Sequence, residues 1–100
     1  MLDDLGARLS PDVIAAFDEI VATRRDLHAH PELKNEERRT QRVVLERLRA
    51  LGIPAEPRAG TGVVGLVEGA EPGPVLLLRA DMDALPIREA GDAPYRSTCE

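Results

Sequence analysis

After residues 1–9, which we expect to be a frayed lead-in, the chain has a segment whose apolar residues recur at helical spacing. Ser10, Pro11 and Asp12 supply an N-cap, a first-turn proline and an early acid. Pro31 disfavours helix at the residue before it. The pattern therefore predicts one helix that starts at Ser10 and ends near His28. Its expected buried stripe consists of Val13, Phe17, Ile20, Val21 and Leu27.

A second segment of the same kind follows Asn35, whose side chain is a common N-cap. The acids Glu36 and Glu37 then suit the positive end of a helix dipole. Gly52 and, two residues later, a proline are typical of a helix end. The expected buried stripe of this helix is Val44, Leu48 and Leu51. Both helices are apolar on one side only, so each needs a sheet to cover.

The pattern then changes to one that is typical of strands. Residues 63–69 are a run with β-branched residues that predicts a strand, and residues 53–58 are a candidate for a short strand before it. The turn residues Gly60, Thr61 and Gly62 lie between them. Residues 75–83 begin with a run of four apolar residues that prolines confine to the length of a strand. Such a run predicts a strand that is covered on both faces, as in a parallel sheet.

This inventory predicts an α/β fold that is incomplete. The expected order is two amphipathic helices followed by two or three strands. A strand that is apolar on both faces implies helices on both sides of its sheet, and two helices can hardly provide them. Residues 88–100 carry no clear element. We therefore expect the chain to be the front of a larger domain.

Two aspartates follow the apolar run directly. In an extended chain Arg79, Asp81 and Asp83 point to one side, with the two carboxylates about 6 to 7 Å apart. Ligands of open α/β sheets bind beyond the carboxyl ends of the strands, which indicates a polar site here. The pattern is also typical of acids that cap the next turn, and Asp83 before Ala84 could do only that.

His28 and His30 form a His-Ala-His sequence that is a second candidate, for a metal. A zinc site needs three or four ligands, and only the distant acids or Cys99 remain. A polar helix terminus, where histidine suits the negative dipole end, is the favoured interpretation. Cys99 has no base nearby in the sequence, and Ser97 lacks the surroundings of a nucleophile elbow, so no nucleophile is expected among them.

Composition narrows the class of partner. A formal net charge of -5 and a pI near 5.0 argue against nucleic acid and against an anionic membrane. A single cysteine allows no intramolecular disulfide. No apolar run approaches the roughly 20 residues of a membrane span, and the first residues carry acids where a secretory leader is basic. These features predict a cytoplasmic protein.

Five stretches taken together resemble one known family. They are similar to the metal-dependent amidohydrolases and metallopeptidases of the aminoacylase and carboxypeptidase type, in the branch of hippurate hydrolase and the indole-acetyl-amino-acid hydrolases. The resemblance covers about residues 15–97. The stretches are RRDLHAHPEL (24–33), RLRALGI (47–53), GTGVVGLVEG (60–69), LLRADMDALPI (77–87) and PYRS (94–97).

The resemblance implies that residues 1–100 are the N-terminal portion of one three-layer α/β catalytic domain. The whole protein would bind two divalent metal ions, Mn or Zn, and would be a homo-oligomer through a smaller inserted domain. Its substrate would be an N-acyl amino acid of the hippurate kind. Enzymes of this family cleave the amide bond with a metal-bound water and a glutamate base, which follows the general logic of metal-assisted hydrolysis.

The resemblance also implies a role for one residue. In carboxypeptidase-type relatives this strand ends in His-x-Asp, where the His binds a metal ion and the Asp orients the His. Asp83 matches that Asp and inherits its supporting role in the active site. Asp81 departs from the His, which puts a ligand role for Asp81 in question. The nearer branch takes ligands from a later His-Ala-Cys-Gly-His-Asp motif, whose surroundings Cys99 lacks.

We therefore expect no complete metal site within these 100 residues, no stable metal binding and no activity of the piece alone. One alternative is a non-catalytic interaction module that derives from the family. Another is a separate small metal site built from the His-Ala-His and Asp-Met-Asp sequences.

Overall fold

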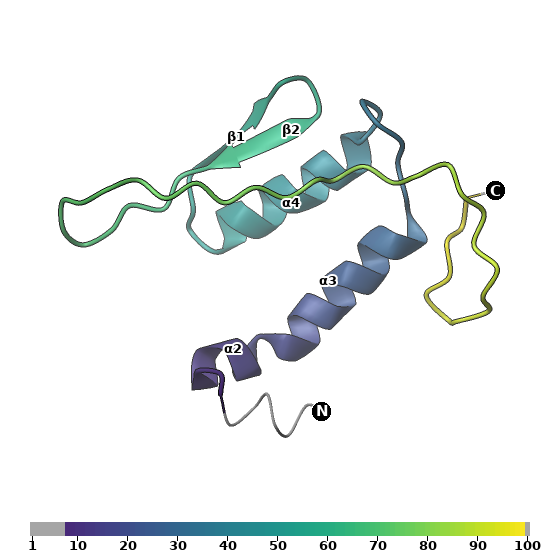
Figure 1. The fold of residues 1–100 in the computed structure, drawn as a ribbon, viewed down its shortest axis with the longest axis horizontal. Helices are drawn as coiled ribbons and strands as arrows, with labels where there is room; N and C mark the ends of the chain where they lie inside the picture. Colours follow the sequence, from purple (N-terminus) through teal and green to yellow (C-terminus); the bar gives the residue numbers. More distant parts are fainter. Residues whose placement is uncertain (1–7, 100) are drawn as a thin grey trace. The chain divides into compact units, whose positions relative to one another are not determined.

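The structure is a computed structural model, and it describes residues 8–99 (Figure 1). It contains helices α2 (Pro11–Ala15), α3 (Phe17–Ala29) and α4 (Arg38–Ala50) and strands β1 (Ala55–Arg58) and β2 (Gly62–Gly65). The chain divides into two units. Among the described residues one unit joins 8–30 to 89–99, and the other is Pro31–Arg88. Helices followed by strands confirm the prediction of an incomplete α/β fold.

Both ends of the first helical region are where the sequence predicts them. The Ser10 hydroxyl accepts a hydrogen bond from the Val13 N–H at 3.4 Å, and Pro11 is the first helical residue. At the other end α3 stops at Ala29, because Pro31 forces the residue before it out of the helical conformation. The N-cap and the end near His28 are therefore confirmed.

The prediction of one continuous helix is wrong, because the region is interrupted at Ala16. The ψ angle of Ala16 is -6°, outside the range of a regular α-helix, so α2 ends there and α3 starts at the next residue. The predicted stripe is not buried either. Its first three members are 42–56% exposed, and the other two are half-buried. The exposed members are Val13, Phe17 and Ile20.

Helix α4 begins at Arg38, and the prediction that Asn35 caps it is wrong. Asn35 adopts the left-handed conformation, with φ of 66°, and its N–H donates to the Glu37 carboxylate at 3.0 Å. An N-cap residue has extended backbone angles, so the left-handed Asn35 lies in a turn before the helix and does not cap it. Asparagine tolerates this conformation better than most residues do.

The acid that caps α4 is Glu32. Its carboxylate accepts the backbone N–H of Arg39 at 3.0 Å and that of Thr40 at 2.6 Å, and also the Thr40 hydroxyl at 2.7 Å. These bonds satisfy donors that a helix N-terminus leaves without intrahelical partners, and they put a negative charge at the positive end of the dipole. The expected acid is therefore present, but it comes from a residue outside the helix.

The C-terminal end of α4 is a Schellman motif. Gly52 has φ of 75° and donates its N–H to the Arg49 carbonyl at 2.9 Å, while the Ile53 N–H reaches the Leu48 carbonyl at 2.9 Å. Only glycine adopts this conformation without a steric penalty. The predicted end of the helix is confirmed.

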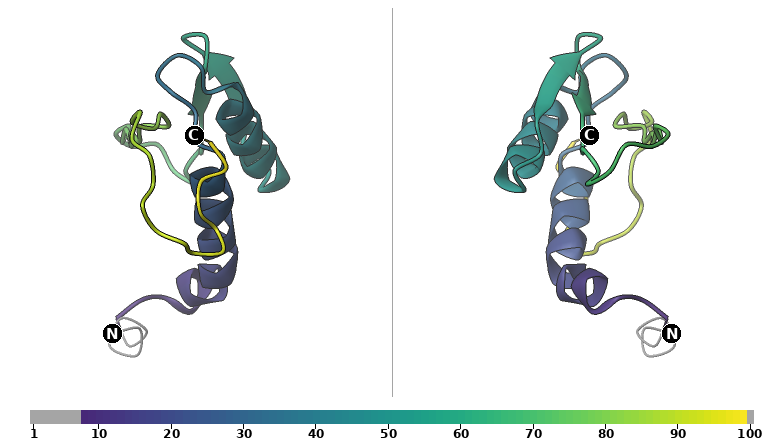
Figure 2. Two further views of the ribbon diagram at one scale, coloured as in Figure 1. Left: turned by 90° about the vertical axis from the view of Figure 1, so that its right-hand side faces the viewer. Right: turned by 90° about the vertical axis from the view of Figure 1, so that its left-hand side faces the viewer.

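Strands β1 and β2 form an antiparallel hairpin that lies against α4 (Figures 1 and 2). The Gln41 side chain fixes the hairpin to the helix by donating to the Gly60 and Gly62 carbonyls, both at 2.9 Å. Leu45 of α4 and Ala55 of β1 are each 8% exposed and form the small apolar core. Strand β1 is a shorter version of the one predicted at 53–58, whereas β2 starts one residue before the predicted range of 63–69 and ends four residues before its end.

The hairpin requires glycine at position 62, where the turn ends and β2 begins. A Cβ atom on Gly62 would lie 2.8 Å from the Arg58 carbonyl oxygen, and this backbone atom cannot swing away. We expect Gly62→Ala to lower the free energy of unfolding by about 1 to 3 kcal/mol, measured by urea denaturation. Gly73→Ala is the control, because nothing lies within 4 Å of its new Cβ atom. Equal stability of the two variants would contradict the prediction.

Residues 75–83 do not form the strand that the sequence predicts. The four residues of the apolar run are 83–92% exposed. An isolated parallel bridge lies directly after this stretch, between Leu33 and Ala84, and the Ala84 N–H donates to the Glu32 carbonyl at 2.8 Å. A strand that is apolar on both faces forms only when neighbours cover it, and Pro31–Arg88 supplies none.

Candidate functional site

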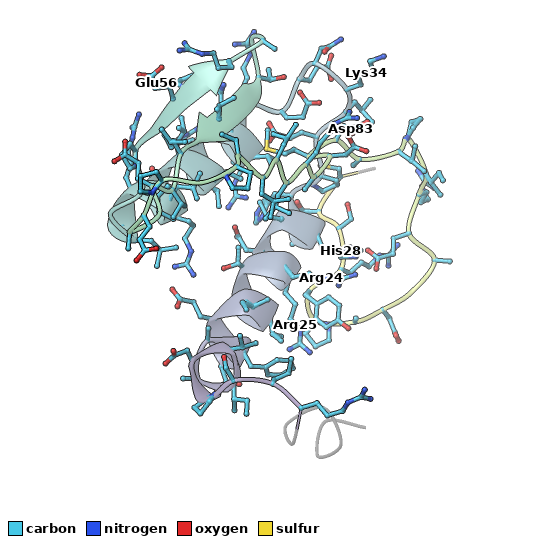
Figure 3. All side chains as sticks on the ribbon, turned by 60° about the vertical axis from the view of Figure 1, so that its left-hand side comes forward. Arg24, Arg25, His28, Lys34, Glu56 and Asp83 are labelled. Atoms are coloured by element: carbon cyan, nitrogen blue, oxygen red, sulfur yellow. The ribbon has the colours of Figure 1, made fainter. Side chains whose placement is uncertain are left out.

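The two predicted site aspartates lie on an open segment. Asp81 forms an ion pair with Arg79 at 3.1 Å, and both side chains are at least three-quarters exposed. Asp83 is exposed as well (Figure 3). Its neighbour Ala84 carries the bridge to Leu33, so the backbone beside Asp83 is anchored.

The described residues do not fit a dinuclear metal site. Between residues 8 and 99 no three His, Cys, Asp or Glu side chains come together in a way that could hold a metal ion. The two histidines have separate partners: His28 lies beside Glu89, and His30 Nδ1 lies 2.9 Å from the Asp26 carbonyl oxygen. We therefore assign no metal-dependent step to these residues.

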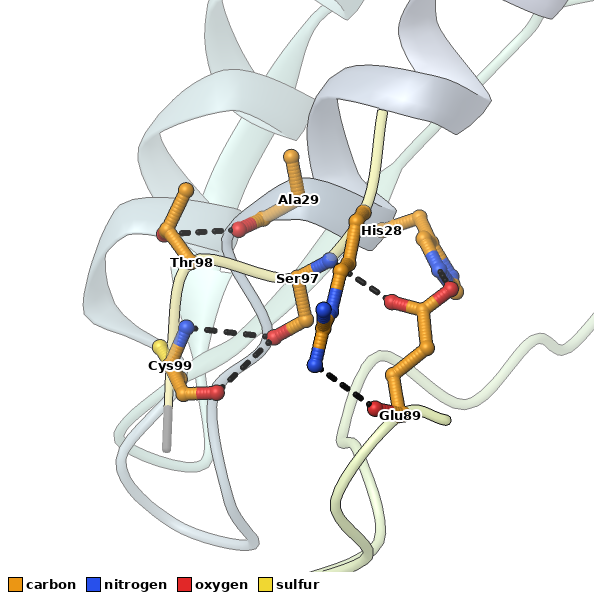
Figure 4. Close-up of polar contacts among 7 residues, drawn as sticks. His28, Ala29, Glu89, Ser97, Thr98 and Cys99 are labelled. Atoms are coloured by element: carbon orange, nitrogen blue, oxygen red, sulfur yellow. Dashed lines mark hydrogen bonds and ion pairs between the residues drawn. The ribbon is translucent and has the colours of Figure 1, made fainter. Parts of the chain in front are cut away.

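The structure instead brings His28 together with Glu89, a residue that the sequence reasoning missed (Figure 4). His28 Nε2 lies 2.9 Å from one carboxylate oxygen of Glu89, and the Ser97 N–H donates to the other at 2.7 Å. The Arg96 guanidinium donates to the Glu89 carbonyl at 3.0 Å. The Ser97 N–H, followed by His28, holds the pKa of the Glu89 carboxyl below its usual value.

Tyr95 completes this cluster with its aromatic ring. The Arg25 guanidinium lies 4.5 Å from the ring centre and that of Arg24 lies 5.9 Å from it, both within the range of a cation–π contact. The His28 ring meets Tyr95 edge to face, with the centres 6.1 Å apart. Figure 3 shows Arg24, Arg25 and His28 along one side of α3.

The geometry of the cluster is not that of a Ser-His-acid triad. In a triad the histidine accepts the proton of the serine hydroxyl. Here the Ser97 Oγ atom faces the backbone of Cys99, with its N–H at 3.2 Å and its carbonyl oxygen at 3.4 Å, while His28 faces the carboxylate. The cluster therefore holds chain segments together and presents no activated nucleophile.

Within residues 8–99 no helix has both the length and the apolar character that crossing a membrane requires.

Known proteins supply the remaining evidence. No protein-family model and no solved structure matches the chain. It is 45% identical over 96 residues to thermostable carboxypeptidase 2 of Saccharolobus solfataricus, which covers 94% of this chain and 24% of the relative. Its other relatives include proteins that are named as amidohydrolases. The chain belongs to this amidohydrolase and carboxypeptidase family.

Two of these relatives are named for the compounds they hydrolyse. The chain is 44% identical over 89 residues to the IAA-amino acid hydrolase ILR1-like 2 of Arabidopsis thaliana, which covers 88% of the chain and 19% of that protein. It is 41% identical over 80 residues to the N-acyl-L-amino acid amidohydrolase of Geobacillus stearothermophilus, which covers 79% of the chain and 22% of that protein. The chain thus spans about a quarter or less of the length of these relatives.

Proposed function

We propose that the chain is part of an amidohydrolase that cleaves the amide bond of N-acyl amino acids of the hippurate kind. The observation that carries this proposal is the identity of 41–44% to relatives named for the hydrolysis of IAA-amino acids and N-acyl-L-amino acids. The open apolar run of residues 75–78 is consistent with it, because that run needs cover from other parts of a larger domain.

In this proposal the chain contributes scaffold and Asp83. The supporting role of Asp83 would be to orient a metal ligand, since a carboxylate behind a ligand fixes the orientation and the protonation of that ligand. The two divalent metal ions, Mn or Zn, would be held by residues other than those described. We accordingly expect the 100-residue chain alone to hydrolyse no N-acyl amino acid, with or without added metal.

A chimera tests the proposal. The matched segment of the Arabidopsis hydrolase is replaced by the corresponding residues of this chain, and hydrolysis of an indole-acetyl amino acid is measured. We expect the chimera to be active, and we expect Asp83→Asn to lower its kcat/KM by about 10- to 100-fold. Asp81→Asn is the matched control, because it makes the same chemical change two residues away, and its effect should be smaller.

Two results would count against this proposal. A chimera that folds, as judged by circular dichroism, and yet fails to turn over substrate while its host does would contradict the assignment of the chain to an amidohydrolase. An active chimera in which Asp83→Asn has no larger effect than Asp81→Asn would contradict the role of Asp83 alone.

A further inference from the structure

Residues 89–98 close onto the C-terminal end of α3 (Figure 4). At one end of this segment Glu89 contacts His28. At the other end both the N–H and the hydroxyl of Thr98 donate to the Ala29 carbonyl at 2.8 Å. That carbonyl lies in the last turn of the helix, where carbonyl groups have no intrahelical donor. Between the two ends, Tyr95 packs on the arginines of α3.

The Glu89 carboxylate ties both ends of the segment together. One oxygen faces the imidazole of His28 on α3, and the other accepts the N–H of Ser97 near the far end of the same segment. Glu89 is about three-quarters shielded from solvent, with a side-chain exposure of 24%. Loss of its charge therefore weakens two contacts at once, the contact with the helix and the contact that closes the loop.

Two charged groups around Glu89 favour its ionised form. They are His28 of α3, which contacts the carboxylate, and Arg96 of the same segment, whose guanidinium bonds the Glu89 backbone carbonyl. Arg24 and Arg25 of α3 lie over the neighbouring Tyr95 ring. The pKa of Glu89 lies below the usual value of 4.5 in the folded state, chiefly because of the Ser97 N–H and then because of His28. A lowered pKa means that the carboxylate stabilises the closed state above pH 4.5 and that this stabilisation disappears as the pH falls.

We propose that residues 89–98 are a clasp on the C-terminal end of α3, that ionised Glu89 holds the clasp closed, and that acid opens the clasp while α3 stays folded. The proposal does not depend on the amidohydrolase assignment. It makes Glu89 a positioning residue for the segment and gives the segment a conformational equilibrium of its own.

Amide hydrogen exchange on the full chain tests the proposal residue by residue. The reporters of the clasp are the N–H groups of Ser97 and Thr98, and the reporter of the helix is the N–H of Ile20, which donates to the Ala16 carbonyl. Protection factors, corrected for intrinsic exchange, are compared between about pH 6 and about pH 3. We expect protection of Ser97 and Thr98 to fall by about 10- to 100-fold over this range, while that of Ile20 falls far less.

Two variants separate the role of the charge from a general loss of structure. Glu89→Gln keeps the shape of the side chain and should already show low protection of Ser97 and Thr98 near pH 6, with little further change in acid. Asp92→Asn removes an exposed carboxylate from the same segment and should behave like the wild type. Thr98→Val removes one bond to Ala29 and should lower protection at Thr98 without altering the pH dependence.

The single tyrosine provides a second readout, because the chain has no tryptophan and Tyr95 lies in the clasp. Quenching of its fluorescence by acrylamide should increase in acid for the wild type, and should be high at every pH for Glu89→Gln. The proposal is overturned if Ser97 and Ile20 lose protection together, or if Glu89→Gln leaves both protection and quenching unchanged near pH 6. Either result would mean that the segment has no equilibrium controlled by Glu89.

Discussion

Replacing Leu45 with alanine is expected to lower the free energy of unfolding of the Pro31–Arg88 unit by about 2 to 4 kcal/mol. Leu45 is only 8% exposed and belongs to α4, which packs against the hairpin, so truncation leaves a cavity in a core that is already small. Domains are stable by only about 5 to 15 kcal/mol in total, so this loss should be conspicuous. Urea denaturation followed by circular dichroism measures it.

Leu51→Ala is the matched control for this prediction. It makes the same change at the end of the same helix, but Leu51 is 73% exposed. Surface substitutions usually change stability by less than about 0.5 kcal/mol. Comparing Leu45→Ala with Leu51→Ala also tests which leucine of α4 is buried. The sequence pattern predicted that Leu51 is buried, whereas the structure buries Leu45. A larger loss for Leu51→Ala would favour the sequence pattern over the structure.

Replacing Glu32 with glutamine is expected to destabilise the same unit by about 1 to 3 kcal/mol near neutral pH, because it weakens the cap of α4. Desolvation raises the pKa of the Glu32 carboxyl, but the bonds from Thr40 and Arg39 outweigh this effect, so the pKa is lowered from its usual 4.5. The carboxylate therefore contributes stability above pH 4.5, and the contribution is lost as the pH falls below that value.

The pH dependence of urea denaturation tests this account. The wild type should lose stability on acidification below about pH 4.5, and Glu32→Gln should lose less because one titrating group has been removed. The free energy of unfolding of Glu32→Gln should still depend on pH, because the Thr61 hydroxyl lowers the pKa of Glu37 as well. Glu36→Gln is the control, as Glu36 is exposed and close in the sequence. Identical profiles for Glu32→Gln and Glu36→Gln would contradict the capping role.

Local signals were sufficient for much of this fold. The cap at Ser10, the helix end before Pro31, the Schellman glycine at position 52 and the hairpin between residues 55 and 65 all depend on interactions within a few residues of each other. The sequence failed where the partner was distant or absent. The cap of α4 comes from Glu32 and not from Asn35, because the long Glu32 side chain reaches forward across a turn that the periodicity does not reveal.

In the candidate site, too, the local signals could be predicted from the sequence and the distant partners could not. The aspartates at positions 81 and 83 were visible because they follow an apolar run, yet the strand that would present them does not form without cover on both faces. Glu89 was missed because its partner His28 is 61 residues away, and nothing around Glu89 marks it as anything but a polar residue in a loop. The family resemblance points to Asp83, but it carries no information about this pairing.

The contact between Leu33 and Ala84 also has a consequence for the order of folding. Closing a loop of 61 residues directly, between His28 and Glu89, carries a large entropy penalty. Once the bridge between Leu33 and Ala84 has formed, the remaining loop from 28 to 33 and from 84 to 89 is only about 10 residues long, which lowers that penalty by about 1.5 kcal/mol. The helix and hairpin of Pro31–Arg88 should therefore fold first, and the pairing of His28 with Glu89 should be a late event that mutations elsewhere in that unit slow down.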